Sequence, residues 1–179
     1  MNRKEFEELS LEHLDALHRG ALRLTGSPED AQDLVQETYV RALRFYAQFQ
    51  SGTNLKAWLF KILKNLFINQ YRRSARTPEP VDLSGPEFNR LEGENPLLGP
   101  GAGGPEAEVI NRLLGEDLQR ALASLPDIFQ RVVILSDIEG FSYKEIAEIE
   151  ECPLGTVMSR LFRARRLLQA MLKKYADGG

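Results

Sequence analysis

The chain has 179 residues, of which 42% are hydrophobic and 27% are charged, so it can fold as one domain or as two small ones. Its formal net charge of -3, taken alone, argues against a nucleic-acid partner, because phosphate repels an acidic protein. Because Cys152 is the one cysteine, a disulfide framework and an all-cysteine metal site are excluded. The sequence has neither a signal-peptide core nor an apolar run of about 20 residues, which predicts a cytoplasmic protein.

Three amphipathic helices are predicted in the first half, where strand patterning is nearly absent. The first carries one apolar face from Phe6 to Leu24. Ser27 is the expected N-cap of the second, with Pro28 in its first turn. A polar loop over 50–54 precedes the third, and three helices with short loops can enclose one small core. The expected inward positions are Phe6, Leu9, Leu14, Leu17, Ala21 and Leu24, then Ala31, Leu34, Val35, Thr38, Ala42, Phe45 and Phe49, then Leu55, Trp58, Leu59, Ile62, Leu63 and Leu66.

The middle of the chain changes character. Residues 77–105 contain six prolines and a glycine-rich run over 99–105, a composition that predicts a linker. Helical patterning returns over 106–124, and Pro126 opens a further helix that ends near Glu139. A short helix and a longer one follow.

The net charge conceals two basic segments. Residues 54–76 and 156–174 each contain six Lys or Arg residues and no acidic one, whereas residues 77–115 contain two basic and seven acidic residues. Because charges are screened beyond about 8–10 Å, the basic segments can act independently of the acidic one. One basic run is equally well a solvated helix face, but two runs, each at the end of a helical segment, favour nucleic acid.

Residues 141–168 have the pattern of a helix-turn-helix. Ser142 and Glu145 form a capping box before a short helix, and Gly155 permits unusual backbone angles in the turn that follows. A basic helix that starts near Thr156 would enter the major groove, where arginines read guanine edges or hold phosphates. The alternative is an ordinary helical hairpin with a solvated basic face. The expected core stripe of the second helix is Leu154, Val157, Leu161, Ala164 and Leu168, and its opposite face is Thr156, Met158, Ser159, Arg160, Phe162, Arg163 and Arg166.

Aromatic side chains alternate with cations and amides along the basic segment of the first half. Such a helix suits unpaired bases, since single strands are held by stacking surfaces and positive charge. Trp58 lies on the inward stripe, so we expect it in the core rather than as a stacking platform. The residues that share roughly one face are Lys61, Asn65, Asn69, Arg72 and Arg76.

The second helix has an apolar residue, Val40, on its outer face. Exposed apolar residues rimmed by charge indicate a protein partner, although scattered ones are common. Signals of an enzyme are absent, because His13 and His18 do not share a helix face and no phosphate-binding loop occurs. We expect Cys152 to be a small buried residue at the turn rather than a redox sensor. The residues around Val40 are Asp33, Gln36, Glu37 and Arg44, with Leu43 beside them.

These segments together resemble the extracytoplasmic-function (ECF) group of bacterial sigma-70 family factors. The resemblance covers both helical halves and leaves out the linker. The chain is particularly similar, over 52–59 and 155–161, to the redox-responsive subgroup that is controlled by a zinc-binding anti-sigma factor. The segments that carry the resemblance are 27–38, 55–65, 125–126, 141–147 and 155–165.

The resemblance implies an all-α fold with two small helical domains. These are a sigma-2 domain over 1–76 and a sigma-4 helix-turn-helix domain over 106–179. A flexible acidic linker over 77–105 joins them. It implies an alternative sigma factor that binds the beta-prime coiled coil and beta flap of core RNA polymerase. Such a factor recognises promoters, melts the minus-10 element and starts transcription in a stress response. It also implies an anti-sigma partner and no catalytic site, cofactor or metal.

The resemblance also implies three sets of binding residues. Met158 stands where many relatives carry Arg or Lys, which favours an apolar contact such as one with a thymine methyl. From the residues alone, two other hypotheses stay open: a stand-alone helix-turn-helix regulator whose first domain senses a ligand or dimerises, and a helical adaptor. The polymerase set is Asp33, Gln36, Glu37, Tyr39 and Leu43; the minus-10 set is Thr53, Asn54, Lys61, Lys64, Asn65, Asn69, Arg72 and Arg73; the minus-35 set is Thr156, Met158, Ser159, Arg160, Phe162, Arg163 and Arg166.

Overall fold

The computed structural model describes residues 1–73 and 115–178, which form helices and, within those ranges, no strand. Three parts of the prediction lie outside the described residues. They are Arg76, the linker over 77–105, and residues 106–114 of the helix expected over 106–124. The described residues pack as two compact units. The first contains 1–73 and 134–157, and the second contains 115–133 and 158–178.

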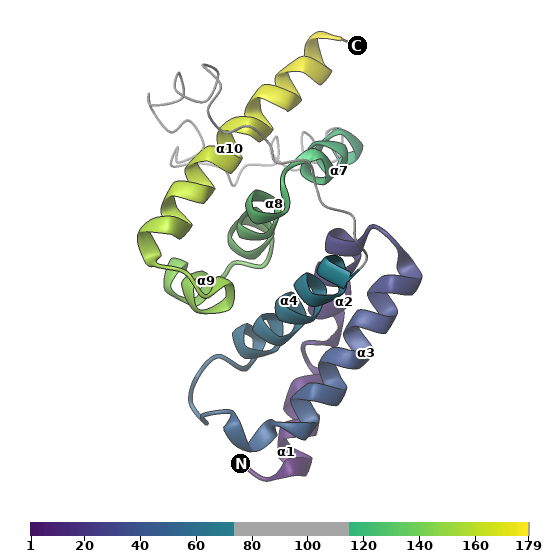
Figure 1. Cartoon of the computed structure of the whole chain (residues 1–179), viewed down its shortest axis with the longest axis vertical. Coiled ribbons are helices and arrows are strands. Elements are labelled where there is room, and N and C mark those ends of the chain that lie inside the picture. Colours follow the sequence, from purple (N-terminus) through teal and green to yellow (C-terminus); the bar gives the residue numbers. More distant parts are fainter. Residues whose placement is uncertain (74–114, 179) are drawn as a thin grey trace, which may run out of the picture. The chain divides into compact units, whose positions relative to one another are not determined.

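Four helices and one short turn of 3-10 helix open the first unit (Figure 1). Capping explains where two of them start. The side chain of Asn2 accepts from the N–H of Glu5 at 2.8 Å, and Ser27 caps α3 as predicted by accepting from the N–H of Asp30 at 3.4 Å. The elements are α1 (Arg3–Leu11), α2 (Leu14–Thr25), α3 (Pro28–Arg44), η1 (Tyr46–Gln48) and α4 (Leu55–Arg73).

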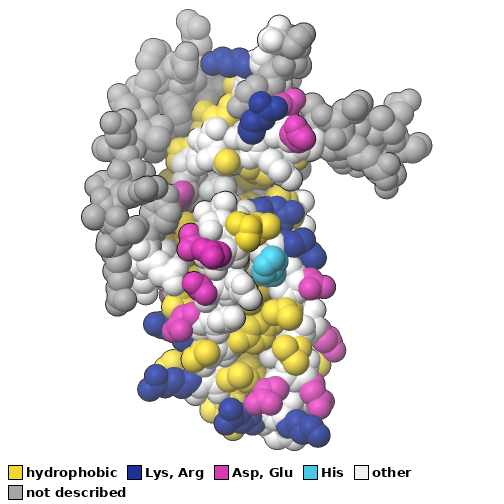
Figure 2. Space-filling model, turned by 90° about the vertical axis from the view of Figure 1, so that its right-hand side faces the viewer, with side chains coloured by type: hydrophobic (Ala, Val, Ile, Leu, Met, Phe, Trp, Pro, Cys, Tyr) yellow, Lys and Arg dark blue, Asp and Glu magenta, His cyan; other side chains and the backbone are white. Residues whose placement is uncertain are grey.

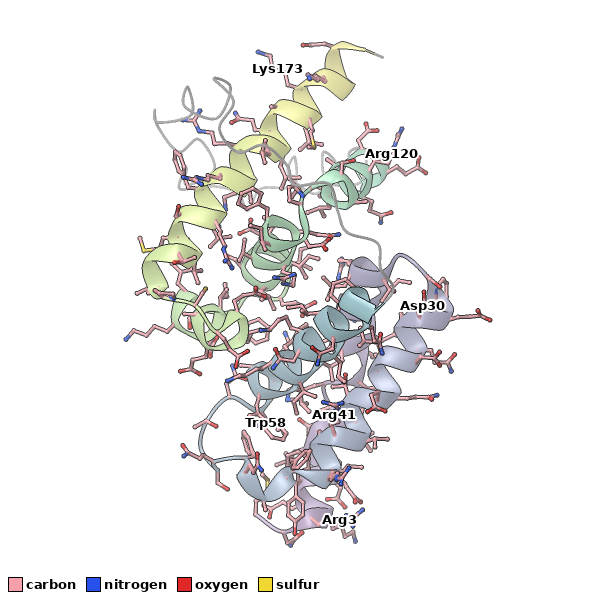
Figure 3. The ribbon with its side chains drawn as sticks, in the orientation of Figure 1. Arg3, Asp30, Arg41, Trp58, Arg120 and Lys173 are labelled. Carbon is pink, nitrogen blue, oxygen red and sulfur yellow. The ribbon has the colours of Figure 1, made fainter. Side chains whose placement is uncertain are left out.

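The core of these helices joins an aliphatic centre to an aromatic end. The ring of Trp58, at the start of α4, lies edge-on to Phe6 with centroids 5.8 Å apart and contacts Phe49 at 5.6 Å (Figure 3). Trp58 therefore packs at the aromatic end of the core, as the sequence predicted, although its side chain is half-buried rather than buried. Fully buried side chains in this core include Phe6, Leu17, Leu34, Leu59 and Leu63.

Two expectations about these helices are wrong. The single helix expected from Phe6 to Leu24 is two helices, because the chain turns at 12–13, where the N–H of His13 donates to the carbonyl of Ser10. The turn redirects the apolar face, so Leu9 and Leu14 are exposed rather than buried. The second wrong expectation concerns the inward stripe predicted to run on through Phe45. Helix α3 stops at Arg44, and Phe45 is exposed because the helical period does not continue into η1.

The rest of the first unit contains the π-helix η2 (Ile134–Ile138), α9 (Tyr143–Glu150) and the start of α10 (Leu154–Asp177). The capping box is confirmed, since the Ser142 hydroxyl accepts from the N–H of Glu145 at 3.2 Å and the Glu145 carboxylate accepts from the N–H of Ser142 at 2.9 Å. Ile146 and Ile149 of α9 are buried.

The turn of the helix-turn-helix differs from the expectation in three ways. The left-handed residue is Glu151, with φ 54° and ψ 45°, and not Gly155, which lies inside α10. Because α10 starts at Leu154, that side chain is exposed rather than part of the core stripe. Cys152 is half-buried rather than buried.

The second unit contains α7 (Gly115–Ser124), α8 (Asp127–Val133) and most of α10. The carbonyl of Pro126 accepts from the N–H groups of Phe129 and Gln130, which places Pro126 at the start of α8 as predicted. Buried apolar side chains here are Ala121, Leu122, Phe129, Val132, Leu161, Ala164 and Leu168. The last three confirm most of the stripe predicted for α10.

Candidate nucleic-acid interface

The loop before α4 and the exposed side of α4 carry the predicted minus-10 residues. Asn54 starts the helix, because its side-chain oxygen accepts from the N–H of Ala57 at 3.1 Å. The Thr53 hydroxyl donates to the carbonyl of Gln50 at 2.8 Å, so both side chains have a defined position. Lys61 and Asn65 are half-buried and Asn69 is exposed. Arg72 and Arg73 continue the helix, and their side chains lie outside the description.

Two carboxylates of the first unit lie against this side of α4. Glu145 accepts from the side-chain amide of Asn54 at 2.8 Å. Glu151 lies 3.6 Å from the ammonium of Lys61 and 3.3 Å from that of Lys64, whose side chain is only 6% exposed. The sequence analysis missed these contacts, because the hydrogen-bonded partners are 87 or more residues apart along the chain.

The contacts also change the ionisation of the carboxylates. The hydrogen bond from Asn54, together with that from the backbone of Ser142, lowers the pKa of Glu145. For Glu151, burial works in the opposite direction, but the hydrogen bonds and charges of Lys64 and Lys61 lower its pKa below the ordinary range. Both side chains are therefore anionic at neutral pH and act as acceptors for the α4 donors.

The exposed side of α10 carries part of the predicted minus-35 set. Met158, Ser159 and Arg163 face solvent, while Thr156, Arg160 and Phe162 are half-buried. Two consecutive turns of one helix thus present an apolar, a hydroxyl and a cationic side chain, which are groups that can contact base edges and phosphates.

Arg166, the last predicted residue on α10, has a more enclosed position. Its guanidinium lies over the ring of Phe162, 5.3 Å from the centroid. Two of its nitrogens, Nε and Nη2, are buried, and neither has a hydrogen-bond partner among the described residues. Both Arg163 and Arg166 were predicted on the outer face of α10. Arg163 is exposed there, whereas Arg166 is half-buried.

The predicted polymerase residues on α3 divide into outward and inward groups. Asp33 and Gln36 are exposed, next to Val40, whose exposed fraction is 59%. Glu37 pairs with Arg41 of the same helix at 3.3 Å. The other two residues of the set point elsewhere: Leu43 is half-buried, and the Tyr39 hydroxyl donates to the carbonyl of Ser10 at 2.7 Å.

The surface over α1 to α3 is mixed in character. Figure 2 shows hydrophobic side chains gathered on the lower half of the face turned to the viewer, flanked by acidic and basic ones. Figure 3 places Asp30 at the start of α3 and Arg41 further along it. Exposed hydrophobic residues of these helices are Leu9, Leu11, Leu14, Leu22 and Val40.

Neither a metal site nor a membrane span is found in the described part of the chain. No group of three His, Cys, Asp or Glu side chains there is placed to hold a metal ion. No described helix is long and apolar enough to cross a bilayer.

Comparison with known proteins decides the family. Residues 9–77 match Sigma-70 region 2, and residues 115–168 match Sigma-70, region 4. The ECF RNA polymerase sigma factor EcfG of Rhodopseudomonas palustris is 40% identical over 163 residues, which cover 91% of this chain and 81% of that protein. The chain belongs to the ECF RNA polymerase sigma factors. It is an alternative sigma factor, a protein that directs transcription initiation by RNA polymerase.

Further relatives agree with this assignment. The sigma factor SigE of Mycolicibacterium smegmatis is 39% identical over 172 residues, which cover 96% of this ECF factor and 63% of SigE. Among solved structures, RpoE of Bartonella quintana in complex with the anti-sigma factor NepR has a TM-score of 0.70 and 35% identity, covering 95% of this chain and 98% of that one. CnrH in complex with the cytosolic domain of CnrY has a TM-score of 0.66 and 25% identity, covering 96% and 90%.

The family assignment confirms the predicted fold class. Region 2 contains α3 and α4, and region 4 contains α9 and α10 up to residue 168, so the first basic segment falls in region 2 and the second begins in region 4 and extends six residues beyond it. The comparisons concern whole regions of the ECF factor, whereas the roles of single residues stay predictions.

Proposed function

We propose that this sigma factor reads promoters with two faces. One consists of the 53–54 loop and the exposed side of α4, which would hold the melted minus-10 strand. The other is the exposed side of α10, which would read the minus-35 element. The observation that supports this most is that α10 turns Ser159 and Arg163 to solvent while Leu161 and Ala164 are buried. Polar and cationic groups are thereby presented on a helix with a packed back, as groove recognition requires.

The domain boundaries at 1–76, 77–105 and 106–179 belong to the same proposal, and the matched regions over 9–77 and 115–168 support a division of the chain into two parts. The factor would have no catalytic site of its own, because the chemistry of RNA synthesis belongs to core polymerase. We also place it in the cytoplasm, where core polymerase and chromosomal DNA meet, and assign it to a stress response.

The outer face of α3 is the proposed contact with core polymerase. Asp33, Gln36 and Val40 form an exposed strip at helical spacing, with charge beside an apolar centre, as many protein interfaces have. Tyr39 would support this strip by tying α3 to α1 through Ser10 rather than by touching polymerase.

An anti-sigma factor is the second proposed protein partner. The solved complexes of RpoE with NepR and of CnrH with CnrY support it by similarity of fold and sequence. Control by a zinc-binding anti-sigma factor of the redox-responsive subgroup stays a prediction. A pull-down from the organism that encodes the chain, searched for a small Cys- and His-rich protein, tests it.

In vitro transcription tests the proposed function without a known promoter. Purified factor and core polymerase are incubated with fragmented genomic DNA, and the 5′ ends of the transcripts are mapped. We expect a set of start sites that share two upstream elements and vanish without the factor. A failure to start transcription, together with tight duplex binding by the chain alone, would favour the stand-alone regulator.

Two variants separate the roles of the two faces in this assay. Arg163→Ala should reduce transcription from those start sites about 10- to 100-fold, whereas Lys173→Ala, an exposed cation near the end of α10, should not. Asn65→Ala should leave promoter binding intact and impair opening, measured as permanganate reactivity of unpaired thymines. Equal losses in binding and opening for Asn65→Ala would contradict its assigned role.

A further inference from the structure

Two carboxylates of the first unit use the same donors that the minus-10 strand would need. Glu145 accepts from the amide of Asn54, and Glu151 lies within ion-pair distance of both Lys61 and Lys64. Glu139 is a third carboxylate against α4, at 3.0 Å from the ammonium of Lys56, a cation that lies beside the minus-10 set without belonging to it. Carboxylate oxygens and phosphate oxygens are interchangeable acceptors for ammonium and amide donors, so one α4 donor cannot serve both fully at once.

The pairs are parts of a packed contact rather than chance meetings of surface charges. The side chains of Glu139 and Lys64 are 4% and 6% exposed, so each of these two charges requires a partner, whereas Glu151, the partner of Lys64, is 53% exposed. The ring of Phe141 packs edge-on against Phe60 of α4 with centroids 5.2 Å apart. The ammonium of Lys56 lies over the Phe141 ring at 4.9 Å, so apolar and charged contacts converge on the same part of α4.

Glu151 occupies an unfavourable backbone conformation at this contact. Among the described residues it is the one non-glycine residue with positive φ. A long side chain is disfavoured in that region, where glycine or asparagine is usual. In this conformation the Glu151 carboxylate lies 3.6 Å from the ammonium of Lys61 and 3.3 Å from that of Lys64, both on α4.

We propose that Glu139, Glu145 and Glu151 form an internal nucleic-acid mimic that covers the minus-10 face of α4 and competes with single-stranded DNA for it. The inference rests on the proposed role of α4 in holding that strand. In the covered state Asn54, Lys61 and Lys64 are satisfied by carboxylates. Binding of the strand requires that α9 and its turn leave α4, so the minus-10 face is accessible only after this contact opens.

Cross-linking tests the contact itself in the intact chain. A carbodiimide joins a carboxylate to an amine only when the two are in direct contact. We expect an amide bond between Glu151 and Lys61 or Lys64, identified by mass spectrometry of the digested protein. The link should be lost in Glu151→Gln and retained in Glu148→Gln, which removes an exposed carboxylate from α9, the helix that precedes Glu151. Absence of the link in the unmodified protein would overturn the proposal.

Strand binding tests the competition. The probe is a fluorescein-labelled single-stranded DNA of mixed sequence and about 20 nucleotides, longer than a typical single-strand site, followed by anisotropy at low salt. The variant Glu139→Gln/Glu145→Gln/Glu151→Gln keeps side-chain size and, at 145, a residue that suits the capping box. Its control, Glu8→Gln/Glu12→Gln/Glu148→Gln, changes net charge equally at exposed positions.

We expect the first triple variant to bind the probe about tenfold more tightly than the control, because donors on α4 become available to phosphate. Glu151→Gln alone should give part of this gain if the triple variant does not fold. Equal affinities of the two triple variants would overturn the proposal. If the wild-type factor still starts transcription on genomic DNA in that case, the proposed function stands and only the competition is refuted.

Discussion

Individual polar side chains decide which predicted residues are available to a partner. Tyr39 was predicted at the polymerase face, but its hydroxyl donates to the carbonyl of the buried Ser10. Lys64 was predicted at the minus-10 face, but its ammonium is buried beside Glu151. In both cases a residue type that suits binding has a structural partner from a distant segment, which local sequence does not reveal.

Tyr39→Phe should cost about 1 kcal/mol in the free energy of unfolding at neutral pH, measured by urea denaturation, because the Ser10 carbonyl loses a donor. Burial raises the pKa of Tyr39 to about 12. The folded protein thus holds this proton more tightly than the unfolded chain does. The stability that this difference contributes is complete below the unfolded pKa of about 10 and is lost as the pH rises from there to about 12. The Phe variant should lack this part of the alkaline decline, and an equal decline in both proteins would contradict the assignment.

Helices were predictable where a local signal marks their ends. The caps at Ser27 and Ser142 and the proline before α8 each fix a start through backbone hydrogen bonds within a few residues. The break after α1 was not predictable from apolar spacing, because the stripe of Leu9 and Leu14 continues across it. The candidate site was predictable by residue type, but its cover of carboxylates was not, because those contacts depend on tertiary packing.

Close packing between α2 and α4 depends on Gly20. A methyl group there would lie 2.9 Å from Cε1 of Phe60, whose ring is buried. Gly20→Ala should therefore lower the free energy of unfolding by about 1–2 kcal/mol, despite the higher helix propensity of alanine. Gly155→Ala in α10 is the matched control, because nothing lies within 4 Å of its Cβ position. It should be neutral or stabilising, and equal effects of the two changes in thermal unfolding would rule out the packing argument.

Basic and acidic residues are concentrated in different segments of the chain, so the net charge does not describe any one surface. The net value of -3 combines the two basic segments, over 54–76 and 156–174, with acidic residues in other segments, including Asp33 on the strip of α3 that we propose for polymerase. The chain alone is therefore expected to bind duplex DNA weakly and to need polymerase for promoter recognition. The exposed strip of α3 is therefore tested by its binding to core polymerase.

Val40→Asp should weaken binding to core polymerase about tenfold or more, because it places a charge at the apolar centre of the α3 strip. Since Val40 is 59% exposed, the unfolding midpoint should change little. Leu11→Asp provides a matched control on α1, where the side chain is 58% exposed. Binding is measured by anisotropy of the labelled factor titrated with core polymerase. Equal losses for the two variants would place the polymerase contact elsewhere.

The aromatic end of the first core gives the protein a built-in optical reporter. Trp58 is the single tryptophan of the chain, and it lies against Phe6 and Phe49, four residues after Asn54. Its emission therefore monitors the first unit alone, whereas circular dichroism averages all helices. Comparing the two signals during denaturation would show whether the units unfold together or in sequence, and quenching on addition of single-stranded DNA would report strand capture without any label.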